Sequence, residues 1–205
     1  MAYIRSKQHI ENTESKPLFS EKTLTRKEKA EAFRFLAAQN LSKRGLHPFF
    51  EVVLNLRVFD WENMCYLNYL LGRRADVLAL GRGFGITIVE VKSSISDFNS
   101  DHKWNDYLKA CDSFYFCSDK KTIKHIFEAI KGHEKEKKIG LMTCDLENMK
   151  LEVTKSSRCD ESLEIPDSIR RLIVYKSLVA ADVFFNGSYS ARIKPAFSYV
   201  GKPYE

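Results

Sequence analysis

The sequence predicts an α/β domain in which α-helices flank a central mixed β-sheet. Three observations lead to this fold class. Runs of β-branched and aromatic residues alternate along the chain with segments of helical periodicity. Hydrophobic residues make up 44% of the 205 residues, which is enough apolar material for a core. A chain of this length suits a single domain with modest extensions.

Composition and charge narrow the environment and the class of partner. The formal net charge is +6, which is compatible with a polyanionic partner but also common in proteins that bind none. Five cysteines occur without a C-x-x-C pair, which indicates reduced thiols rather than a disulfide framework or a zinc site. No apolar run reaches about 18 residues, and the N-terminus lacks an apolar signal segment. We therefore expect a cytoplasmic protein without a membrane span.

The first quarter of the chain predicts an arm, a helix and a strand. Residues 1–24 are polar and aperiodic, and we interpret them as a flexible N-terminal arm. A helix begins after Thr25, which forms a capping box with Glu28, and it ends at Gly45. The run EVVLNLRVF, residues 51–59, predicts the first strand.

The stretch RRADVLALGRGFGITIVEVKSS predicts a β-hairpin. Two apolar runs flank the loop GRGFG, whose glycines permit positive φ angles. With symmetry about Gly83, Asp76 in the first arm directly faces Glu90 in the second. The preceding residues, 60–72, fit either a short apolar helix or an extended excursion.

The second half of the chain predicts further alternation of helices and strands. Ser100 is expected to cap a helix through SDHKWNDYLKACDS, which the strand FYFCS follows. Residues 121–138 predict a helix followed by the charged stretch HEKEKKI, which is a solvated helix end or a loop. The strands IGLMTCD and KLEVTK and a helix over roughly 167–185 complete the pattern. We interpret residues 25–190 as the domain and residues 191–205 as a C-terminal tail.

The predicted hairpin gathers the residues that carry chemistry. The two-residue period of a strand puts Glu90 and Lys92 on one face with Ile86 and Ile88, and Asp76 joins them from the neighbouring strand. Two carboxylates this close repel each other unless a cation or a proton lies between them. A surface lattice of weak salt bridges is the alternative. The apolar character of both runs argues against it, because it indicates strands buried on both faces, where charges are costly unless they serve a site.

Such a group of side chains suits a hard divalent cation, Mg²⁺ or Mn²⁺, which prefers oxygen ligands and keeps several waters. Two carboxylates and a backbone carbonyl leave positions open for water and a phosphate oxygen. The ammonium of Lys92 can orient that water or offset charge on the phosphate. Nearby carboxylates keep Lys92 charged, so its role as a proton acceptor stays open.

At these residues the chain resembles a known superfamily. Ala75-Asp76, thirteen residues, and Glu90-Val91-Lys92 resemble the motif of the PD-(D/E)xK nucleases, with alanine in place of the usual proline. The strings RRADVLAL, IVEVKSSISDF and DHKWNDYLKACDSFYF resemble the MmcB-type DNA repair proteins of bacteria, a family of that superfamily. The similarity is close over roughly residues 73–117 and looser elsewhere. It implies a restriction-endonuclease-like core, in which residues 57–72 would be an insertion.

The resemblance implies roles for residues of the hairpin, one position at a time. Asp76 and Glu90 would be metal ligands, and the carbonyl of Val91 would be a third. Lys92 would be the catalytic lysine. A metal-activated water would then attack a phosphodiester of DNA.

Residues outside this motif are further candidates. Glu51, on the strand after the first helix, would be another metal ligand or orient a metal water, and Glu31 is a weaker candidate for that role. Ser93 and Ser94 follow the lysine and would donate to a phosphate or hold Lys92.

Contacts with nucleic acid are expected from three side chains near the motif. Arg74 shares the face of Asp76 and either binds phosphate or neutralises nearby acid. Lys103 either contacts a phosphate or is solvated, and Trp104 either stacks on an exposed base or packs inside the protein, with packing favoured. Asp112 is expected to hold a turn or to pair with Arg74.

Three functions fit these residues. The first is a metal-dependent DNA endonuclease or exonuclease acting in repair. The second is a non-catalytic DNA-binding subunit of a repair complex, and the third is a restriction-like nuclease or one directed at RNA. The intact acid, acid and lysine trio favours the first. Homodimerisation and a protein partner in a repair complex stay open.

Overall fold

The structure, a computed structural model, describes residues 24–60, 63–158 and 165–186. The predicted N-terminal arm, apart from Leu24, and the predicted tail 191–205 lie outside this part. In the described part, a six-stranded mixed sheet has the order β1-β4-β5-β6-β7-β8, and β2 and β3 form a separate pair. No helix in the described ranges combines the length and apolarity needed to cross a membrane. The strands are β1 (His47–Val53), β2 (Arg57–Asp60), β3 (Cys65–Asn68), β4 (Arg74–Leu80), β5 (Ile86–Val91), β6 (Ser113–Asp119), β7 (Ile139–Asp145) and β8 (Lys150–Lys155).

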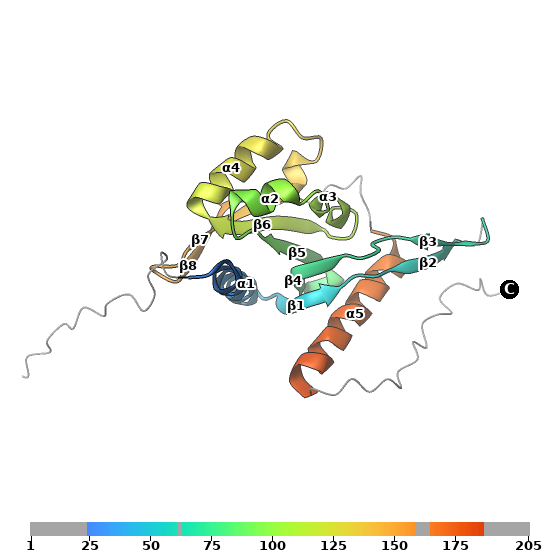
Figure 1. Cartoon of the computed structure of the whole chain (residues 1–205). Coiled ribbons are helices and arrows are strands. Elements are labelled where there is room, and N and C mark those ends of the chain that lie inside the picture. The colour runs from blue at the N-terminus through green and yellow to red at the C-terminus, as the bar shows by residue number, and fades with distance from the viewer. Residues whose placement is uncertain (1–23, 61–62, 159–164, 187–205) are drawn as a thin grey trace, which may run out of the picture.

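Helices cover both faces of the sheet, so the predicted fold class is confirmed (Figure 1). β1, β4 and β5 are antiparallel neighbours, β5, β6 and β7 run parallel, and β8 returns antiparallel. Helical crossovers join the parallel strands, as they must, because a tight turn cannot connect parallel neighbours. The helices are α1 (Arg26–Lys43), α2 (Ile95–Ser100), α3 (Trp104–Tyr107), α4 (Lys120–Ile130) and α5 (Asp167–Asn186), with short 3₁₀ turns η2 (Arg82–Phe84) and η3 (Glu136–Lys138).

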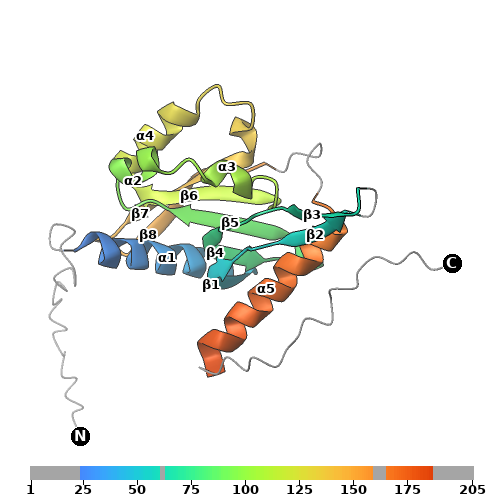
Figure 2. The same cartoon turned by 45° about the vertical axis from the view of Figure 1, so that its right-hand side comes forward.

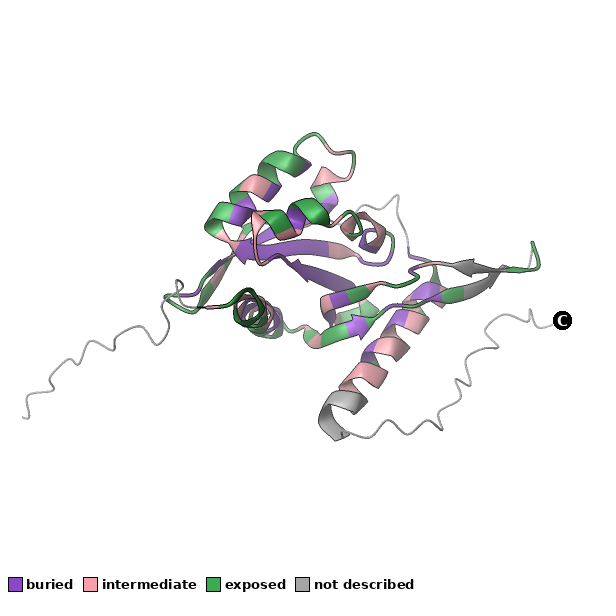
Figure 3. Cartoon of the chain, viewed as in Figure 1, coloured by how far each residue is buried: buried purple, intermediate pink, exposed green. Residues whose placement is uncertain are grey.

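Two apolar cores form on the two faces of the sheet. On one face, α2, α3 and α4 pack over Ile86, Ile88 and Phe116, and on the other α1 packs over Val89 and Val91. α5 lies across β1 and contributes to the first core (Figure 2). Every residue of β5 is buried, as the purple colour of this strand shows (Figure 3). The prediction that this strand is buried on both faces is therefore confirmed.

The β4–β5 hairpin has the predicted register. Val77 pairs with Val89 and Leu80 pairs with Ile86, which is the symmetry about Gly83 expected from the sequence. Gly83 itself adopts a positive φ of 65°, which a glycine tolerates without strain.

Asp112 holds the end of this hairpin. Its Oδ2 accepts a hydrogen bond from the Ile86 N–H at 2.6 Å, as expected for a residue that holds a turn. The predicted pairing with Arg74 is wrong, because Arg170 of α5 donates to both carboxylate oxygens at 2.7 and 3.0 Å. Sequence spacing could not reveal this partner, which lies 58 residues away along the chain.

Two predicted elements differ from the structure. The strand expected over 51–59 is divided into β1 and β2, because the chain leaves the sheet at Leu54 and Leu56, whose side chains are buried. Ser100 does not cap a helix; Ser94 caps α2, which ends at Ser100, and α3 follows as a separate turn. In the segment 121–138 the helix α4 ends at Ile130, and the charged stretch HEKEKKI, expected to be a helix end or a loop, contains the 3₁₀ turn η3.

The segment 57–72, expected to be an insertion, contains the two strands of the β2–β3 pair. The pair extends from the end of the sheet near α5 (Figure 2). The extended alternative for residues 60–72 therefore fits β3 better than the helical one.

Gly140 on β7 predicts a sensitive packing position. A Cβ at this residue would lie 2.4 Å from two ring carbons of Tyr115 and 2.8 Å from the Ser157 backbone nitrogen. We expect Gly140→Ala to lower the free energy of unfolding by about 1–3 kcal/mol, because the ring and the backbone must both move. Urea denaturation measures this loss.

Gly85→Ala is the matched control. Its Cβ would meet nothing closer than 3.8 Å, and the residue has a φ of −58° that alanine adopts freely. An equal loss in both variants would contradict the packing explanation.

Candidate metal centre

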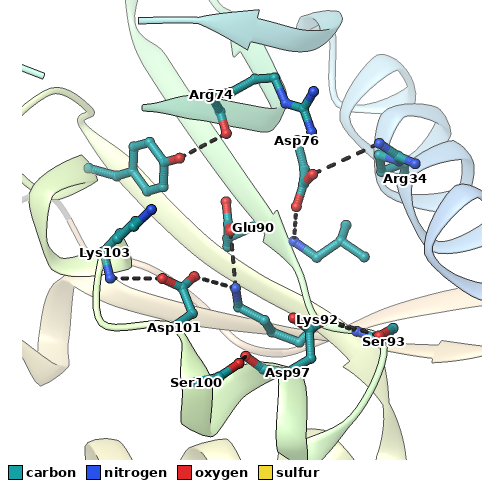
Figure 4. A network of polar contacts seen from close by, with 12 residues as sticks. Arg34, Arg74, Asp76, Glu90, Lys92, Ser93, Asp97, Ser100, Asp101 and Lys103 are labelled. Atoms are coloured by element: carbon teal, nitrogen blue, oxygen red, sulfur yellow. Dashed lines mark hydrogen bonds and ion pairs between the residues drawn. The ribbon is translucent and has the colours of Figure 1, made fainter. Parts of the chain in front are cut away.

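The candidate site lies where β4 and β5 separate. Their register places Asp76 opposite Glu90, but the paired ladder ends one residue earlier, at Val77 and Val89. The Asp76 side chain occupies the place of the next ladder contact, since its Oδ2 accepts a hydrogen bond from the Val91 N–H at 2.9 Å. Asp76 is thereby held at the carboxyl end of β5 (Figure 4).

The backbone orients the carbonyl of Val91 toward the same place. The N–H and the C=O of one residue in a strand point to the same side. Because the Val91 N–H points to Asp76, its carbonyl faces that side as well. The Lys92 N–H points the other way and donates to the Cys117 carbonyl of β6 at 3.0 Å.

Glu90 is a buried carboxylate of which only one oxygen has a hydrogen-bond partner among the described residues. Its Oε1 accepts from the Lys92 ammonium at 3.1 Å, whereas its buried Oε2 has no hydrogen-bond partner among the described residues. Burial, and then the charge of Asp76, raise the pKa of Glu90 to about 8, although Lys92 opposes the shift. The ionised form of Glu90 is therefore costly in the free protein.

Asp76 shares this cost. Burial raises its pKa, and the Val91 N–H and the charges of Arg34 and Lys92 compensate only in part. A divalent cation near both carboxylates would lower the free-energy cost of ionising Asp76 and Glu90.

The residues present fit an oxygen-liganded divalent cation. Among the described residues, no group of three or more His, Cys, Asp or Glu side chains could enclose a metal ion. A full protein cage is not required for Mg²⁺, which keeps several waters and often takes one or two carboxylates. The protein ligands would be three oxygens: the Oε2 of Glu90, which has no described partner, a carboxylate oxygen of Asp76, and the Val91 carbonyl, which faces the same side as the Val91 N–H.

Lys92 is held as an ammonium by two carboxylates. Its side chain is 3% exposed and forms ion pairs with Glu90 and Asp101. Burial alone would lower the pKa of Lys92, but the charge of Glu90 and the bond with Asp101 outweigh it, so the pKa is raised. Lys92 therefore keeps its proton at neutral pH and is poorly suited to act as a base.

Asp101 is a site residue to which the sequence analysis assigned no role. It lies after α2, pairs with Lys92, and accepts a hydrogen bond from the Lys103 N–H at 2.7 Å. Burial would raise the pKa of Asp101, but these bonds lower it. The sequence spacing between Lys92 and Asp101 does not predict their contact, because the length and direction of α2 decide where Asp101 lies.

Arg34 of α1 is the second residue that the sequence analysis did not identify. Its guanidinium forms an ion pair with Glu51, and its Nη1 lies 3.9 Å from Oδ1 of Asp76 (Figure 4). The sequence does contain an indication that Arg34 faces the sheet, because the apolar residues Ala37, Ala38 and Leu41 follow it at helical spacing. All three are buried in the structure. Arg34 thus belongs to the face of α1 that packs on the sheet.

Glu51 lies close to Asp76, but both of its carboxylate oxygens pair with arginine side chains. The β1–β4 register puts it opposite Asp76, and its φ of 50° marks a local distortion of β1. Arg34 pairs with one of its carboxylate oxygens, and Arg74 lies 3.4 Å from the other. Glu31 is exposed on α1 and has no such contacts among the described residues.

The two serines after Lys92 hold the start of α2. Ser94 accepts a hydrogen bond from the Asp97 N–H at 3.2 Å, while Asp97 accepts from the backbone and the hydroxyl of Ser93. This arrangement is a helix N-cap. It gives both hydroxyls a structural role, and neither contacts the Lys92 ammonium among the described residues.

The three predicted nucleic-acid contacts differ in exposure. The Arg74 side chain is 59% exposed, and Lys103 is exposed beside Asp101. Trp104 packs in the core, stacked on Phe114 and edge-on to Phe116, so the favoured packing interpretation agrees with the structure.

Comparisons with known proteins agree with this fold. A family model described as DNA repair protein MmcB-like matches residues 23–145. A solved structure from Silicibacter pomeroyi, the SPO1766 protein of unknown function, is similar with a TM-score of 0.57 and 20% identity, over 84% of this chain and 99% of the other. This likeness supports the fold alone. None of the curated protein sequences matches the chain significantly.

The raised pKa of Glu90 predicts a pH-dependent effect of Glu90→Gln. A carboxyl with a pKa of about 8 in the folded protein against an ordinary 4.5 binds its proton more tightly when folded, so its contribution to stability falls as the pH rises between these values. Glutamine does not titrate. Without metal, the variant should therefore be more stable than the wild type by about 1–3 kcal/mol at pH 8, and this gain should shrink at pH 5.

Urea denaturation in a chelator at both pH values measures the difference. Glu128→Gln, on the exposed face of α4, is the control and should show no such pH dependence. A gain for Glu90→Gln that is the same at pH 5 and pH 8 would contradict the assignment.

Proposed function

Because the chain belongs to the MmcB-like family of DNA repair proteins, we propose that it is a metal-dependent nuclease that hydrolyses phosphodiester bonds of DNA in repair. The observation that carries this proposal is the buried Glu90, whose Oε2 has no described partner, beside Asp76 and the Lys92 ammonium. Charges buried at such a cost indicate a functional site.

A Mg²⁺ or Mn²⁺ ion held by Asp76, Glu90 and the Val91 carbonyl would polarise a phosphate oxygen and lower the pKa of a water. The chain's own contribution is to hold these ligands before the cation arrives. The Val91 N–H fixes Asp76, and Lys92 fixes one oxygen of Glu90. Preorganised ligands cost little rearrangement at the moment of reaction.

Lys92 acts in this proposal as a fixed positive charge. An ammonium has three N–H donors, and Glu90 and Asp101 occupy two of them. The third donor has no partner among the described residues, and it would orient the attacking water or hold a phosphate oxygen. Because the pKa of Lys92 is raised, the proton of the water passes to solvent or to the DNA rather than to this amine.

Arg74 and Lys103 would contact the DNA backbone on either side of the carboxylates. Both side chains are exposed; the Arg74 side chain pairs with Glu51, and the backbone N–H of Lys103 donates to Asp101. Phosphate contacts of this kind position DNA without reading its sequence. These two contacts would therefore hold DNA of any sequence at the site.

A cleavage assay tests the proposal. The wild type should cut single-stranded, duplex, flap or mismatched DNA with Mg²⁺ or Mn²⁺ and not with a chelator. Asp76→Asn, Glu90→Gln and Lys92→Met should each lower the rate by roughly 100-fold or more, since each removes charge stabilisation from the site. Circular dichroism and DNA affinity check that the variants fold and bind.

The same assay separates the other functions. Tight DNA binding by the wild type with no cleavage of any substrate would favour the non-catalytic subunit of a repair complex. Preferential cleavage of RNA would contradict the assignment to DNA repair.

Asp101 is predicted to be a positioning residue for Lys92. Asp101→Asn keeps the shape but weakens the bond to the ammonium, and we expect the cleavage rate to fall about 10- to 100-fold with the KM for DNA nearly unchanged. Asp106→Asn on α3 is the matched control, because Asp106 pairs with Arg73 and not with Lys92. A change in KM alone would contradict a role through Lys92.

A further inference from the structure

Arg34 stands out because it is the cation nearest to Asp76 and comes from outside the hairpin. Its side chain is 17% exposed, and its Nη1 lies between Glu51 and Oδ1 of Asp76. Its charge opposes the rise in the pKa of Asp76 more strongly than that of Lys92 does. In the free protein, Arg34 therefore neutralises part of the charge that a metal ion would neutralise.

The charges around the site do not balance once a cation is added. The described ion pairs form two neighbouring groups: Glu51 and Asp76 with Arg34 and Arg74, and Glu90 and Asp101 with Lys92. Together these four carboxylates and three cationic side chains have a formal net charge of −1 when all are ionised. A divalent cation would change this value to +1. One phosphodiester, which carries a single negative charge, would restore neutrality.

A divalent cation on Asp76 would repel the guanidinium that lies 3.9 Å from Oδ1. Glu51 would not be left without a partner if Arg34 moved, because Arg74 lies 3.4 Å from its other oxygen. Arginine is also well suited to bind a phosphate through two parallel hydrogen bonds.

We propose that Arg34 is a displaceable counter-ion that couples metal binding to DNA binding. In the free protein its guanidinium holds Glu51 and neutralises Asp76. When a divalent cation occupies the site, the guanidinium leaves Asp76 and binds a non-bridging oxygen of the DNA phosphate beside it. This inference rests on the proposed metal site, and it adds a phosphate ligand from α1 that the family motif does not contain.

The proposal predicts opposite effects of Arg34→Gln on two measurements. The variant lacks the cation that competes for Asp76, so Mg²⁺ should bind the DNA-free protein roughly two- to tenfold more tightly. The same variant lacks the phosphate ligand, so cleavage at a fixed, saturating Mg²⁺ concentration should fall about tenfold or more. Metal affinity is measured from the thermal shift of the DNA-free protein over a Mg²⁺ titration.

Two further variants sharpen the test. Arg34→Lys keeps the charge but cannot bind a phosphate through two parallel bonds, so Mg²⁺ affinity should stay within about twofold while cleavage falls. Lys43→Gln removes the same charge from the exposed last turn of α1, roughly 13 Å further along the helix, and should change neither measurement by more than about twofold.

The outcomes separate this proposal from the proposed function. If the wild type does not cleave, the second measurement becomes DNA affinity in Mg²⁺ by fluorescence anisotropy, and the opposite changes are still expected. Unchanged or weaker Mg²⁺ binding by Arg34→Gln would overturn the competition with Asp76. Unchanged cleavage, or unchanged DNA affinity where there is no cleavage, would overturn the role as phosphate ligand. If Arg34→Gln does not fold, tighter Mg²⁺ binding or undiminished cleavage by Arg34→Lys would overturn the proposal.

Discussion

The hydrogen bond from the Val91 N–H to Asp76 is the contact around which the site is built. At 2.9 Å it takes the place of a ladder contact where β4 and β5 part. A strand end normally leaves such a backbone donor to water or to a neighbouring strand. Here a carboxylate accepts the bond, so the point where the two strands separate also fixes the position of Asp76, the proposed metal ligand.

The parallel part of the sheet explains why the remaining charges can be buried beside this contact. β5 is buried along its whole length, and its carboxyl end is anchored to β6 through the backbone of Lys92. Loops that follow parallel strands collect at this edge, which is where open α/β sheets commonly bind ligands. α2 begins shortly after Lys92, and the residue that follows its last turn, Asp101, pairs with the Lys92 ammonium. The positive charge of Lys92 is therefore paired before any substrate binds.

The proposed metal site implies that the free protein and a metal-bound protein would differ in what balances the carboxylates. In the free protein, the Lys92 ammonium pairs with Glu90, and the Arg34 guanidinium lies beside Asp76. A divalent cation would compete with the guanidinium for Asp76 but would leave Lys92 between Glu90 and Asp101. Among Arg34, Arg74 and Lys92, the side chain of Lys92 is the most deeply buried, whereas that of Arg74 reaches solvent. Family membership indicates the DNA repair role, and the likeness to the Silicibacter pomeroyi structure concerns the fold.

The sequence by itself determined the fold class, the register of the β4–β5 hairpin and the trio of Asp76, Glu90 and Lys92. These depend on short-range features, namely the two-residue period of strands and the glycine turn, which a single chain segment displays. Only the tertiary structure decided that Asp101 pairs with Lys92, that Arg34 reaches Glu51 and Asp76, and that Asp112 pairs with Arg170. The physical reason is that these ion pairs join elements whose relative positions follow from the packing of helices on the two faces of the sheet, and no local sequence pattern encodes that packing.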